Sequence, residues 1–201
     1  MAHAQPKMPV EHGAPDPMPL MHPLMKKNYG KWVYHSHPKP GVLMHRAAGG
    51  DEIWTVKAGT QRQMDHHTVR TLCDIADRFA DGHVRFTTRS NIEFMVADKA
   101  KVEPLIGALN KAGFPVGGTA NSVSMIAHTQ GWLHCDIPGT DASGVVKSLM
   151  DELYDEFVKC EMPNRVKLST SCCEINCGGQ ADIAIIVQHT KPQDPKLAER
   201  S

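Results

Sequence analysis

Four of the six cysteines in this chain lie in segments whose composition is typical of loops. Cys172, Cys173 and Cys177 lie between a predicted strand and the pair Gly178-Gly179, and Cys135 lies earlier, in a segment rich in Gly, Ser, Thr, Asn and His. Thiols on irregular backbone are typical ligands of a metal site. The pattern therefore favours a metal-binding site formed by these loops.

The overall composition excludes several classes of protein. The chain has 22 Lys and Arg against 22 Asp and Glu, so its formal charge is 0, which argues against a general nucleic-acid binder. No apolar run approaches the roughly 18 residues of a membrane span. The first residues are rich in Pro and His, which predicts no secretory leader and a cytoplasmic location. In that compartment the cysteines are expected to be thiols, metal ligands or reactive groups instead of structural disulfides.

Three interpretations of the cysteine motif stay open from its chemistry. A single zinc ion needs four ligands around one point, and adjacent Cys172 and Cys173 suit that geometry poorly. A [4Fe–4S] cluster offers four separate irons, so neighbouring thiols can each bind one, and this interpretation is favoured. A set of redox or structural thiols is the third. Cys73 and Cys160 are predicted to be structural, the first on the inward face of a helix and the second at a helix end.

The chain divides into three parts by composition and periodicity. Residues 1–27 contain many Pro and Met without a period, which predicts no helix or central strand and suggests either a disordered tail or an extended arm that wraps a partner. Residues 28–120 predict an α+β block with strands at 42–45, 51–56, 83–88 and 91–96 and helices at 64–80 and 99–112. One face of the strand at 83–88 is expected to be apolar, through Val84 and Phe86, and the other basic.

Residues 121–201 predict a second block around the cysteines. The long polar segment at 115–141 is expected to be functional because it carries Cys135. A helix is predicted at 143–159 and strands at 165–170 and 182–187. The last strand is continuously apolar, which implies cover on both faces, and in the chain as it stands the strand is expected to lack part of that cover and to leave an edge open to aggregation.

Basic residues form the second functional signal. Arg85 and Arg89 bracket one predicted strand, Arg165 and Lys167 share a face of another, and Arg62 follows a Gly-Thr-Gln turn. Individually these side chains suit a solvated surface. Together they suit a basket for a polycarboxylate ligand or a small oxyanion, since Arg offers planar paired donors and Lys a point charge. In the cysteine segment, His128 and His134 are candidates for a proton relay or for support of the ligands.

The residues at 129–141 (TQGWLHCDIPGTD) and 165–180 (RVKLSTSCCEINCGGQ) resemble the beta subunit of dissimilatory sulfite reductase. The strand at 84–89 (VRFTTR) resembles the Thr-Thr-Arg strand of siroheme sulfite and nitrite reductases in general. The resemblance runs from about residue 28 to residue 192. It implies an α+β fold with a ferredoxin-like N-terminal block and a siroheme- and [4Fe–4S]-binding block.

The resemblance also implies cofactors, roles and partners. Cys135, Cys172, Cys173 and Cys177 match the cluster ligands, and Cys177 matches the cysteine that bridges to the siroheme iron. The basic residues match positions that hold siroheme carboxylates or an anion, and in the heteromer they are expected to line either this chain's siroheme or the partner's: Arg62, Arg85, Arg89, Arg165 and Lys167. The implied reaction is the six-electron interconversion of sulfite and sulfide. The implied partners are an alpha subunit in an α2β2 assembly and a small sulfur carrier with C-terminal cysteines.

The chain departs from this family in one respect. The family's beta subunit continues into a small ferredoxin domain and then completes the siroheme block, whereas this chain stops at Ser201 after a polar stretch at 193–201. The second block is therefore expected to be incomplete, and activity of the chain alone is in doubt. The other hypothesis is a non-catalytic iron–sulfur or zinc module with a structural role in an assembly.

Overall fold

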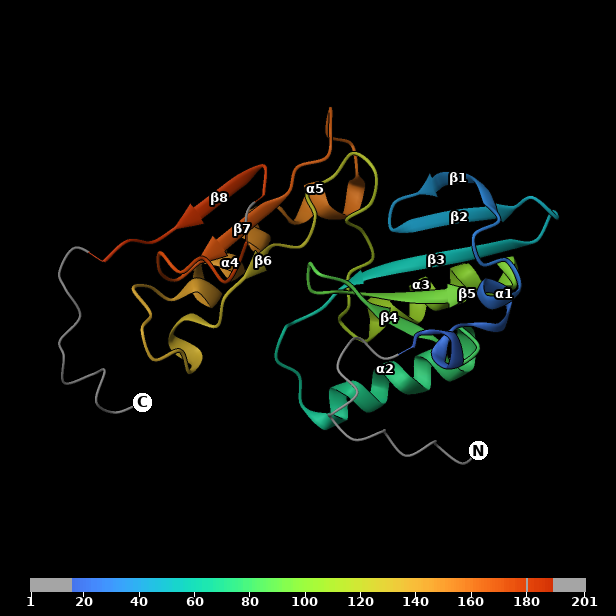
Figure 1. The fold of residues 1–201 in the computed structure, drawn as a ribbon, viewed down its shortest axis with the longest axis horizontal. Coiled ribbons are helices and arrows are strands. Elements are labelled where there is room, and N and C mark those ends of the chain that lie inside the picture. The colour runs from blue at the N-terminus through green and yellow to red at the C-terminus, as the bar shows by residue number, and fades with distance from the viewer. Residues whose placement is uncertain (1–15, 180, 190–201) are drawn as a thin grey trace.

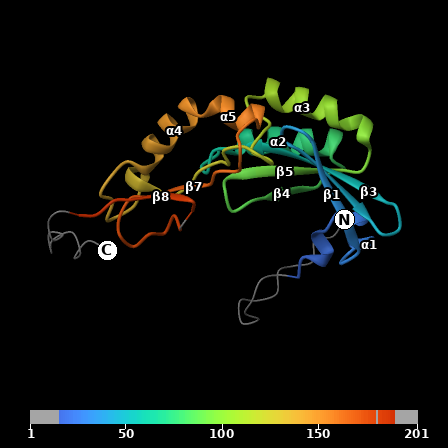
Figure 2. The ribbon, with the colours of Figure 1, turned by 90° about the horizontal axis from the view of Figure 1, so that it is seen from above.

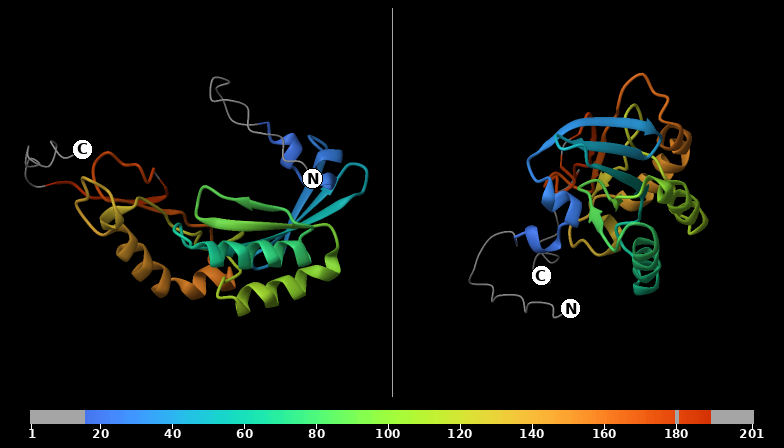
Figure 3. Two further views of the ribbon diagram at one scale, coloured as in Figure 1. Left: turned by 90° about the horizontal axis from the view of Figure 1, so that it is seen from below. Right: turned by 90° about the vertical axis from the view of Figure 1, so that its right-hand side faces the viewer.

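Helices lie on one side of two β-sheets that follow each other along the chain. The computed structural model describes residues 16–179 and 181–189. Two views show the longer helices as one layer and the strands as another (Figure 2, Figure 3). These helices are α2 (His66–Phe79), α3 (Val102–Lys111), α4 (Ala142–Glu152) and α5 (Tyr154–Lys159). Within the described residues, the opposite faces of the sheets carry no helix of this length.

The first sheet is antiparallel, with the strand order β1-β2-β3-β5-β4 (Figure 1). Its strands are β1 (Trp32–Lys39), β2 (Val42–Ala47), β3 (Glu52–Gly59), β4 (Val84–Phe86) and β5 (Asn91–Val96). The central strands β3 and β5 are buried along nearly their whole length. Because alternate side chains point to opposite faces, one set packs under the helices and the other lies on the open face.

The helices α2 and α3 cover the apolar face of this sheet. The Asp65 carboxylate caps α2 by accepting a hydrogen bond from the Thr68 N–H at 2.7 Å. Leu72, Ile75 and Ala76 form its buried stripe. The short helix η2 (Lys99–Lys101) leads into α3. The order β3-α2-β4-β5-α3 supplies most of a ferredoxin-like β-α-β-β-α-β unit.

Two short helices precede the first sheet, η1 (Met18–Leu20) and α1 (Pro23–Lys27). The prediction that residues 1–27 sustain no helix is wrong for α1. Pro23 occupies the first turn, where its missing N–H leaves no hydrogen bond unmade, and His22 Nδ1 accepts a hydrogen bond from the Leu24 N–H at 3.1 Å. Residues 1–15 of the predicted arm lie outside the described residues.

The second sheet is parallel, with the order β6-β7-β8. Its strands are β6 (Ala127–His128), β7 (Leu168–Ser171) and β8 (Ile183–Ile186), and the short helix η3 (Gly131–Leu133) follows β6. Beneath it a smaller core forms from Val123, Ile126, Val146 and Leu168, with Leu149 and Leu153 packed against it. No helix in the described part of the chain is long and apolar enough to cross a membrane.

Phe157 on α5 packs against the segment that links the two sheets. Its side chain is fully buried, and its carbonyl oxygen accepts a hydrogen bond from the Gly118 N–H at 2.9 Å. A Cβ atom on Gly117 would lie 2.2 Å from the same oxygen. Only glycine therefore permits this approach at position 117.

The structure confirms the predicted α+β class and most predicted elements, with differences at the edges. The strand β1 was not predicted; it contains Pro38, which an edge strand tolerates. The predicted helix at 143–159 is divided at Leu153 into α4 and α5. The strand predicted at 165–170 begins only at Leu168 as β7, and Val166 makes a single bridge to Val123.

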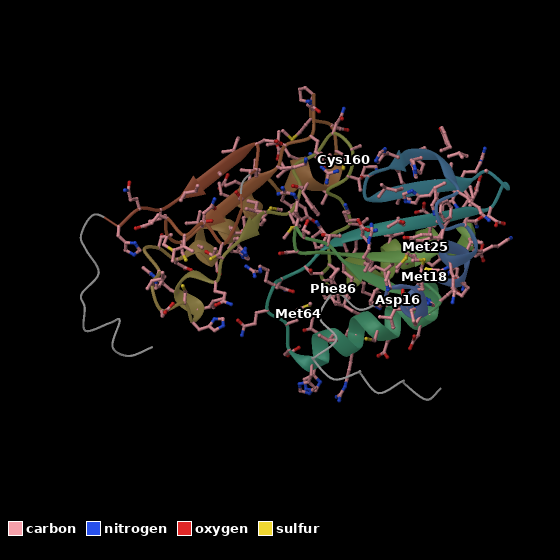
Figure 4. The ribbon with its side chains drawn as sticks, in the orientation of Figure 1. Asp16, Met18, Met25, Met64, Phe86 and Cys160 are labelled. Atoms are coloured by element: carbon pink, nitrogen blue, oxygen red, sulfur yellow. The ribbon has the colours of Figure 1, made fainter. Side chains whose placement is uncertain are left out.

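Two predicted burial patterns are wrong, those of Cys73 and Phe86. Cys73 is exposed because the buried stripe of α2 runs through residues 72, 75 and 76, which leaves position 73 to one side. Phe86 is exposed on β4 (Figure 4). All four residues of β8 are exposed, because the strand lies at the sheet edge and nothing described covers it. The polar stretch at 193–201 lies outside the described residues.

Candidate functional site

The cysteine motif lies at the carboxyl end of the parallel sheet. Cys172 follows Ser171, the last residue of β7, and the segment with Cys135 follows β6 and η3. In open sheets with parallel strands, ligand sites form where strands end at this edge. The topology thus places the two cysteine segments at one edge of the sheet.

Thr129 connects these two segments directly. Its Oγ1 accepts a hydrogen bond from the backbone N–H of Cys172 at 2.9 Å. From the same segment, the Gly139 N–H donates to the Cys172 carbonyl at 2.7 Å. Cys172 and Cys173 are 2% and 4% exposed, and Cys135 packs against them. Three of the four predicted ligands are therefore grouped at one place.

The fourth predicted ligand, Cys177, is exposed on a loop that folds back onto β7. Ser171 Oγ donates to Asn176 Oδ1 at 2.8 Å and accepts from the Gly178 N–H at 3.1 Å. Asn176 has a positive φ of 56°. A Cβ atom on Gly178 would lie 2.6 Å from the Thr170 carbonyl oxygen, so this glycine permits the close return of the chain.

The grouped thiols influence one another's protonation. Burial raises the pKa of the Cys172 thiol, but hydrogen bonds with Thr129 and Cys135 outweigh burial, and the pKa lies below its ordinary value. For Cys173, burial dominates and raises the thiol pKa. Cys172 is thus the member of the group most readily converted to thiolate, the form that binds metal.

The ligand set fits a cluster better than a single ion. Within residues 16–179 and 181–189, no three His, Cys, Asp or Glu side chains converge in a way that would hold one metal ion. Each iron of a [4Fe–4S] cluster takes its own thiolate, so the four sulfurs need not meet at one point. Three grouped thiols and one on an adjoining glycine-supported loop suit that requirement.

The remaining two cysteines lie elsewhere. Cys73 is on the exposed side of α2. Cys160 lies at the end of α5 (Figure 4), where its backbone is left-handed and its Sγ is 3.5 Å from the Phe157 carbonyl oxygen. Neither packs in the group formed by Cys135, Cys172 and Cys173.

A cavity of about 600 Å³ adjoins the cysteine segment. Arg62, His128 and His134 line it together with Thr129, whose hydroxyl also holds Cys172. His128 Nδ1 is buried with no hydrogen-bond partner among the described residues. Burial and, second, the charge of Arg62 lower the pKa of His128. The cavity therefore combines the permanent cation of Arg62 with polar side chains and suits an anionic ligand.

The other predicted cations contact different parts of the chain. Arg89 Nη1 donates to the Leu168 carbonyl at 3.3 Å, which ties the β4–β5 turn to the start of β7. Arg165 Nη2 donates to the Gly118 carbonyl at 3.4 Å. Lys167 is exposed, and its backbone N–H donates to Asp182. No described contact joins the five predicted cations to one another.

Arg85 belongs to a charged row that sequence reasoning did not identify. Its guanidinium pairs with Glu93, whose other oxygen lies 3.0 Å from Lys57 Nζ. Lys57 and Glu93 were missed because each looks like an ordinary strand residue. The signal that would have found them is their register, since Lys57 is opposite Glu93 and Glu93 is opposite Arg85.

Comparison with known proteins identifies the first block. Residues 45–112 match the family model described as the nitrite/sulfite reductase ferredoxin-like half domain, which confirms the predicted ferredoxin-like character. The fold resembles the crystal structure of dissimilatory sulfite reductase I, with a TM-score of 0.72 and 14% identity over 81% of this chain and 42% of that one. It also resembles Mycobacterium tuberculosis NirA, with a TM-score of 0.56 and 14% identity over 69% of this chain and 26% of that one.

Closer sequence relatives are named dissimilatory-type sulfite reductase subunit beta. The Archaeoglobus fulgidus protein is 46% identical over 92% of this chain, and the Nitratidesulfovibrio vulgaris protein is 46% identical over 85%. The chain spans about half the length of these two relatives, 53% and 47%. The Megalodesulfovibrio gigas protein is 45% identical over 85% of this chain and 68% of its own length. The chain therefore belongs to the family of dissimilatory-type sulfite reductase beta subunits.

Proposed function

We propose that this chain is a subunit of an oxidoreductase that interconverts sulfite and sulfide. The observation that carries the proposal is the grouping of Cys135, Cys172 and Cys173 at the carboxyl end of a parallel sheet, beside an anion-suited cavity. Its family membership supports the same reaction. We further propose the division into an arm at 1–27, a ferredoxin-like domain at 28–120 and a partial cofactor-binding domain at 121–201.

The proposed cofactors are a [4Fe–4S] cluster and siroheme. Cys135, Cys172, Cys173 and Cys177 would hold the cluster, with Cys177 as the thiolate shared with siroheme. Arg62, Arg85, Arg89, Arg165 and Lys167 would hold siroheme carboxylates or the anionic substrate, on this chain's siroheme or the partner's. When bound, these groups supply the electron transfer to sulfur that protein side chains cannot perform. The chain's cations would stabilise the oxyanion, and His128 and His134 would move protons near Arg62.

The proposed partners follow from the family. An alpha subunit in an α2β2 assembly would complete the sites, and a small carrier with C-terminal cysteines would accept the sulfur product. Unpaired thiols suit a reducing compartment, so we propose a cytoplasmic location.

A non-catalytic iron–sulfur or zinc module with a structural role in an assembly is the second candidate, because the grouped thiols of Cys135, Cys172 and Cys173 need no tetrapyrrole to bind metal. Visible absorption of the purified chain with its alpha subunit distinguishes the two. Siroheme gives bands in the red region, an isolated cluster gives a broad brown shoulder, and zinc gives no absorption. A preparation without siroheme bands after production with siroheme supplied would favour the structural module.

Substitution of the cysteines tests the proposed ligands. Cys172→Ser and Cys177→Ser should abolish cluster assembly, because each removes one thiolate, whereas Cys160→Ser should leave it intact. Cys160 is a matched control because it is a half-buried thiol at the end of a helix. Iron and acid-labile sulfide would be measured on each variant with its alpha subunit. Equal loss in all three variants would contradict the assignment.

A further inference from the structure

Three charged side chains form a row across the open face of the first sheet. Lys57, Glu93 and Arg85 occupy directly opposed positions on β3, β5 and β4. Alternation along β5 places Glu93 on the face opposite to Phe94, which packs in the core with α2 and α3. The row therefore lies on the sheet face that no described long helix covers (Figure 2).

The carboxylate of Glu93 is the centre of this row. Its Oε1 lies 3.0 Å from Lys57 Nζ, and its Oε2 accepts a hydrogen bond from Arg85 Nε at 2.8 Å and a second from Nη2. The Glu93 side chain is 4% exposed and that of Lys57 11%, whereas that of Arg85 is 59% exposed. The buried carboxylate thus fixes one edge of a guanidinium whose other edge faces outward.

The bonds to Glu93 leave donors of Arg85 available. The guanidinium has five N–H donors in a rigid plane, and the described contacts use only Nε and Nη2. Within the described residues, no acceptor is bonded to Nη1. The guanidinium also borders a cavity of about 190 Å³ lined by Trp32, Met95 and other side chains. A planar donor pair held in one orientation is the geometry that recognises a carboxylate.

A contribution to stability does not by itself explain why the Glu93 carboxylate is buried between two cations. A buried ion pair stabilises a fold little more than apolar residues of the same size would. A row of two cations and one carboxylate also keeps a net charge of +1, which favours an anion placed beside the exposed Arg85.

We propose that Glu93 is a positioning residue that orients Arg85 toward a carboxylate of an anionic ligand. The class of that ligand, a tetrapyrrole polycarboxylate, is taken from the proposed function, on which the inference rests. Glu93 makes no contact with the ligand itself and acts through the guanidinium.

The direction in which Glu93→Gln changes the affinity for an anion distinguishes a positioning role from a purely electrostatic one. Glu93→Gln removes a negative charge, so charge alone predicts tighter binding of an anion. Loss of orientation predicts weaker binding, by about tenfold, the factor equivalent to about 1.4 kcal/mol of charge-assisted hydrogen bonding. Uroporphyrin, a metal-free polycarboxylate, would be titrated into the full chain with its alpha subunit and binding followed by fluorescence. Unchanged or tighter binding in Glu93→Gln would overturn the inference.

Two further variants keep the test decisive. Glu52→Gln is the matched control, because Glu52 pairs with Arg46 on the same sheet in the same manner, and it should leave uroporphyrin binding within about twofold. Glu93→Asp keeps the charge but withdraws the carboxylate by one methylene. It should weaken binding as Glu93→Gln does, and it serves as the test if the glutamine variant fails to fold.

A second measurement is independent of the tetrapyrrole. The Arg85 Nε–H signal in a nitrogen-edited NMR spectrum should be protected from solvent exchange in the parent chain and lose that protection in Glu93→Asp, with the backbone spectrum retained. Equal protection in both proteins would overturn the inference. Failure of the parent chain to bind uroporphyrin, with this protection still dependent on Glu93, would instead overturn the tetrapyrrole part of the proposed function.

Discussion

At the scale of single residues, a few polar side chains with little exposure hold the proposed ligands and their loops in place. Thr129 contacts a proposed cluster ligand and Glu93 a proposed cation, and Ser171 holds the loop that carries Cys177. None of the three stands out in the sequence by type, because Thr, Ser and Glu are common on any surface. Their contacts become visible only in the fold: Thr129 bonds to Cys172, 43 residues away, whereas Ser171 and Glu93 bond to Asn176 and Arg85, 5 and 8 residues away.

The ion row predicts a pH dependence of stability. Burial raises the pKa of Glu93, but the charges of Lys57 and Arg85 outweigh it, so the folded pKa lies below its ordinary value. The stabilisation is therefore complete above the unfolded carboxyl pKa, about 4.3, and is lost as the pH falls through the folded pKa. The free energy of unfolding of Glu93→Gln should be lower than that of the parent by about 3 kcal/mol at pH 7, with a smaller difference at pH 3.

Urea denaturation at both pH values measures that difference. Glu52→Gln should cost less than about 1 kcal/mol at pH 7, because its ion pair with Arg46 is partly exposed. A difference for Glu93→Gln that grows toward pH 3 would show that the carboxylate is not stabilised in the folded state.

The glycine at position 117 gives a second prediction at this scale. Gly117→Ala should lower the free energy of unfolding by about 2 kcal/mol or more, because its Cβ would meet the Phe157 carbonyl oxygen at 2.2 Å. Gly107→Ala is the control: it lies in α3 with nothing within 4 Å of the added carbon, and it should stabilise by about 0.5–1 kcal/mol. Chemical denaturation of both variants measures the changes, and equal effects would contradict the packing argument.

At the scale of elements, local sequence patterns predicted the bounds of several helices and strands. The helix α2 and the β4–β5 pair were predicted near their true bounds because local patterns define them. The strand β1 was missed because an edge strand with Pro38 buries little and carries no alternation. The burial of Lys57 and Glu93 was missed because it depends on the register of strands that are far apart in the chain.

The residues of the candidate site were also predicted only in part. The cysteines were found from their spacing and flanking glycines, and three of the four are grouped. The five cations together were predicted to suit a basket for one ligand, which stays a prediction, and four of them contact different parts of the chain. Residue type indicates which ligand a side chain suits, whereas tertiary packing decides which side chains share that ligand.

The edge strand β8 carries a prediction of its own. Ile183, Ile185 and Ile186 are exposed on a strand with one free edge, which is the arrangement that promotes strand-to-strand association. Ile183→Lys should reduce aggregation, seen as light scattering on warming, while the free energy of unfolding changes by less than about 0.5 kcal/mol. Thr71→Lys adds the same charge on α2 and should leave aggregation unchanged. Equal effects of the two variants would point to net charge as the cause instead of the strand edge.

At the scale of the whole molecule, the helices gather on one side and leave the sheet faces open on the other (Figure 3). Arg89 connects the two sheets from the β4–β5 turn, and Arg85 lies on the open face of the first. The cysteine loops are held by β7 and Thr129 instead. Arg85 and Arg89 are therefore held by contacts other than those that hold the cysteine loops.

That difference in contacts predicts different losses from the same assembly. Arg85→Ala and Arg89→Ala should each reduce the tetrapyrrole content of the heteromer more than its iron and labile sulfide, because a partly desolvated carboxylate needs a charged donor while the cluster is held by thiolates. Arg89→Ala should also destabilise the chain, since it removes the bond to Leu168 that joins the sheets, whereas Arg85→Ala leaves that bond intact. Tetrapyrrole absorption and metal content would be measured on the same preparations. Parent-level tetrapyrrole in both variants would eliminate the binding role, and parallel loss of tetrapyrrole and cluster would contradict the expected difference between them.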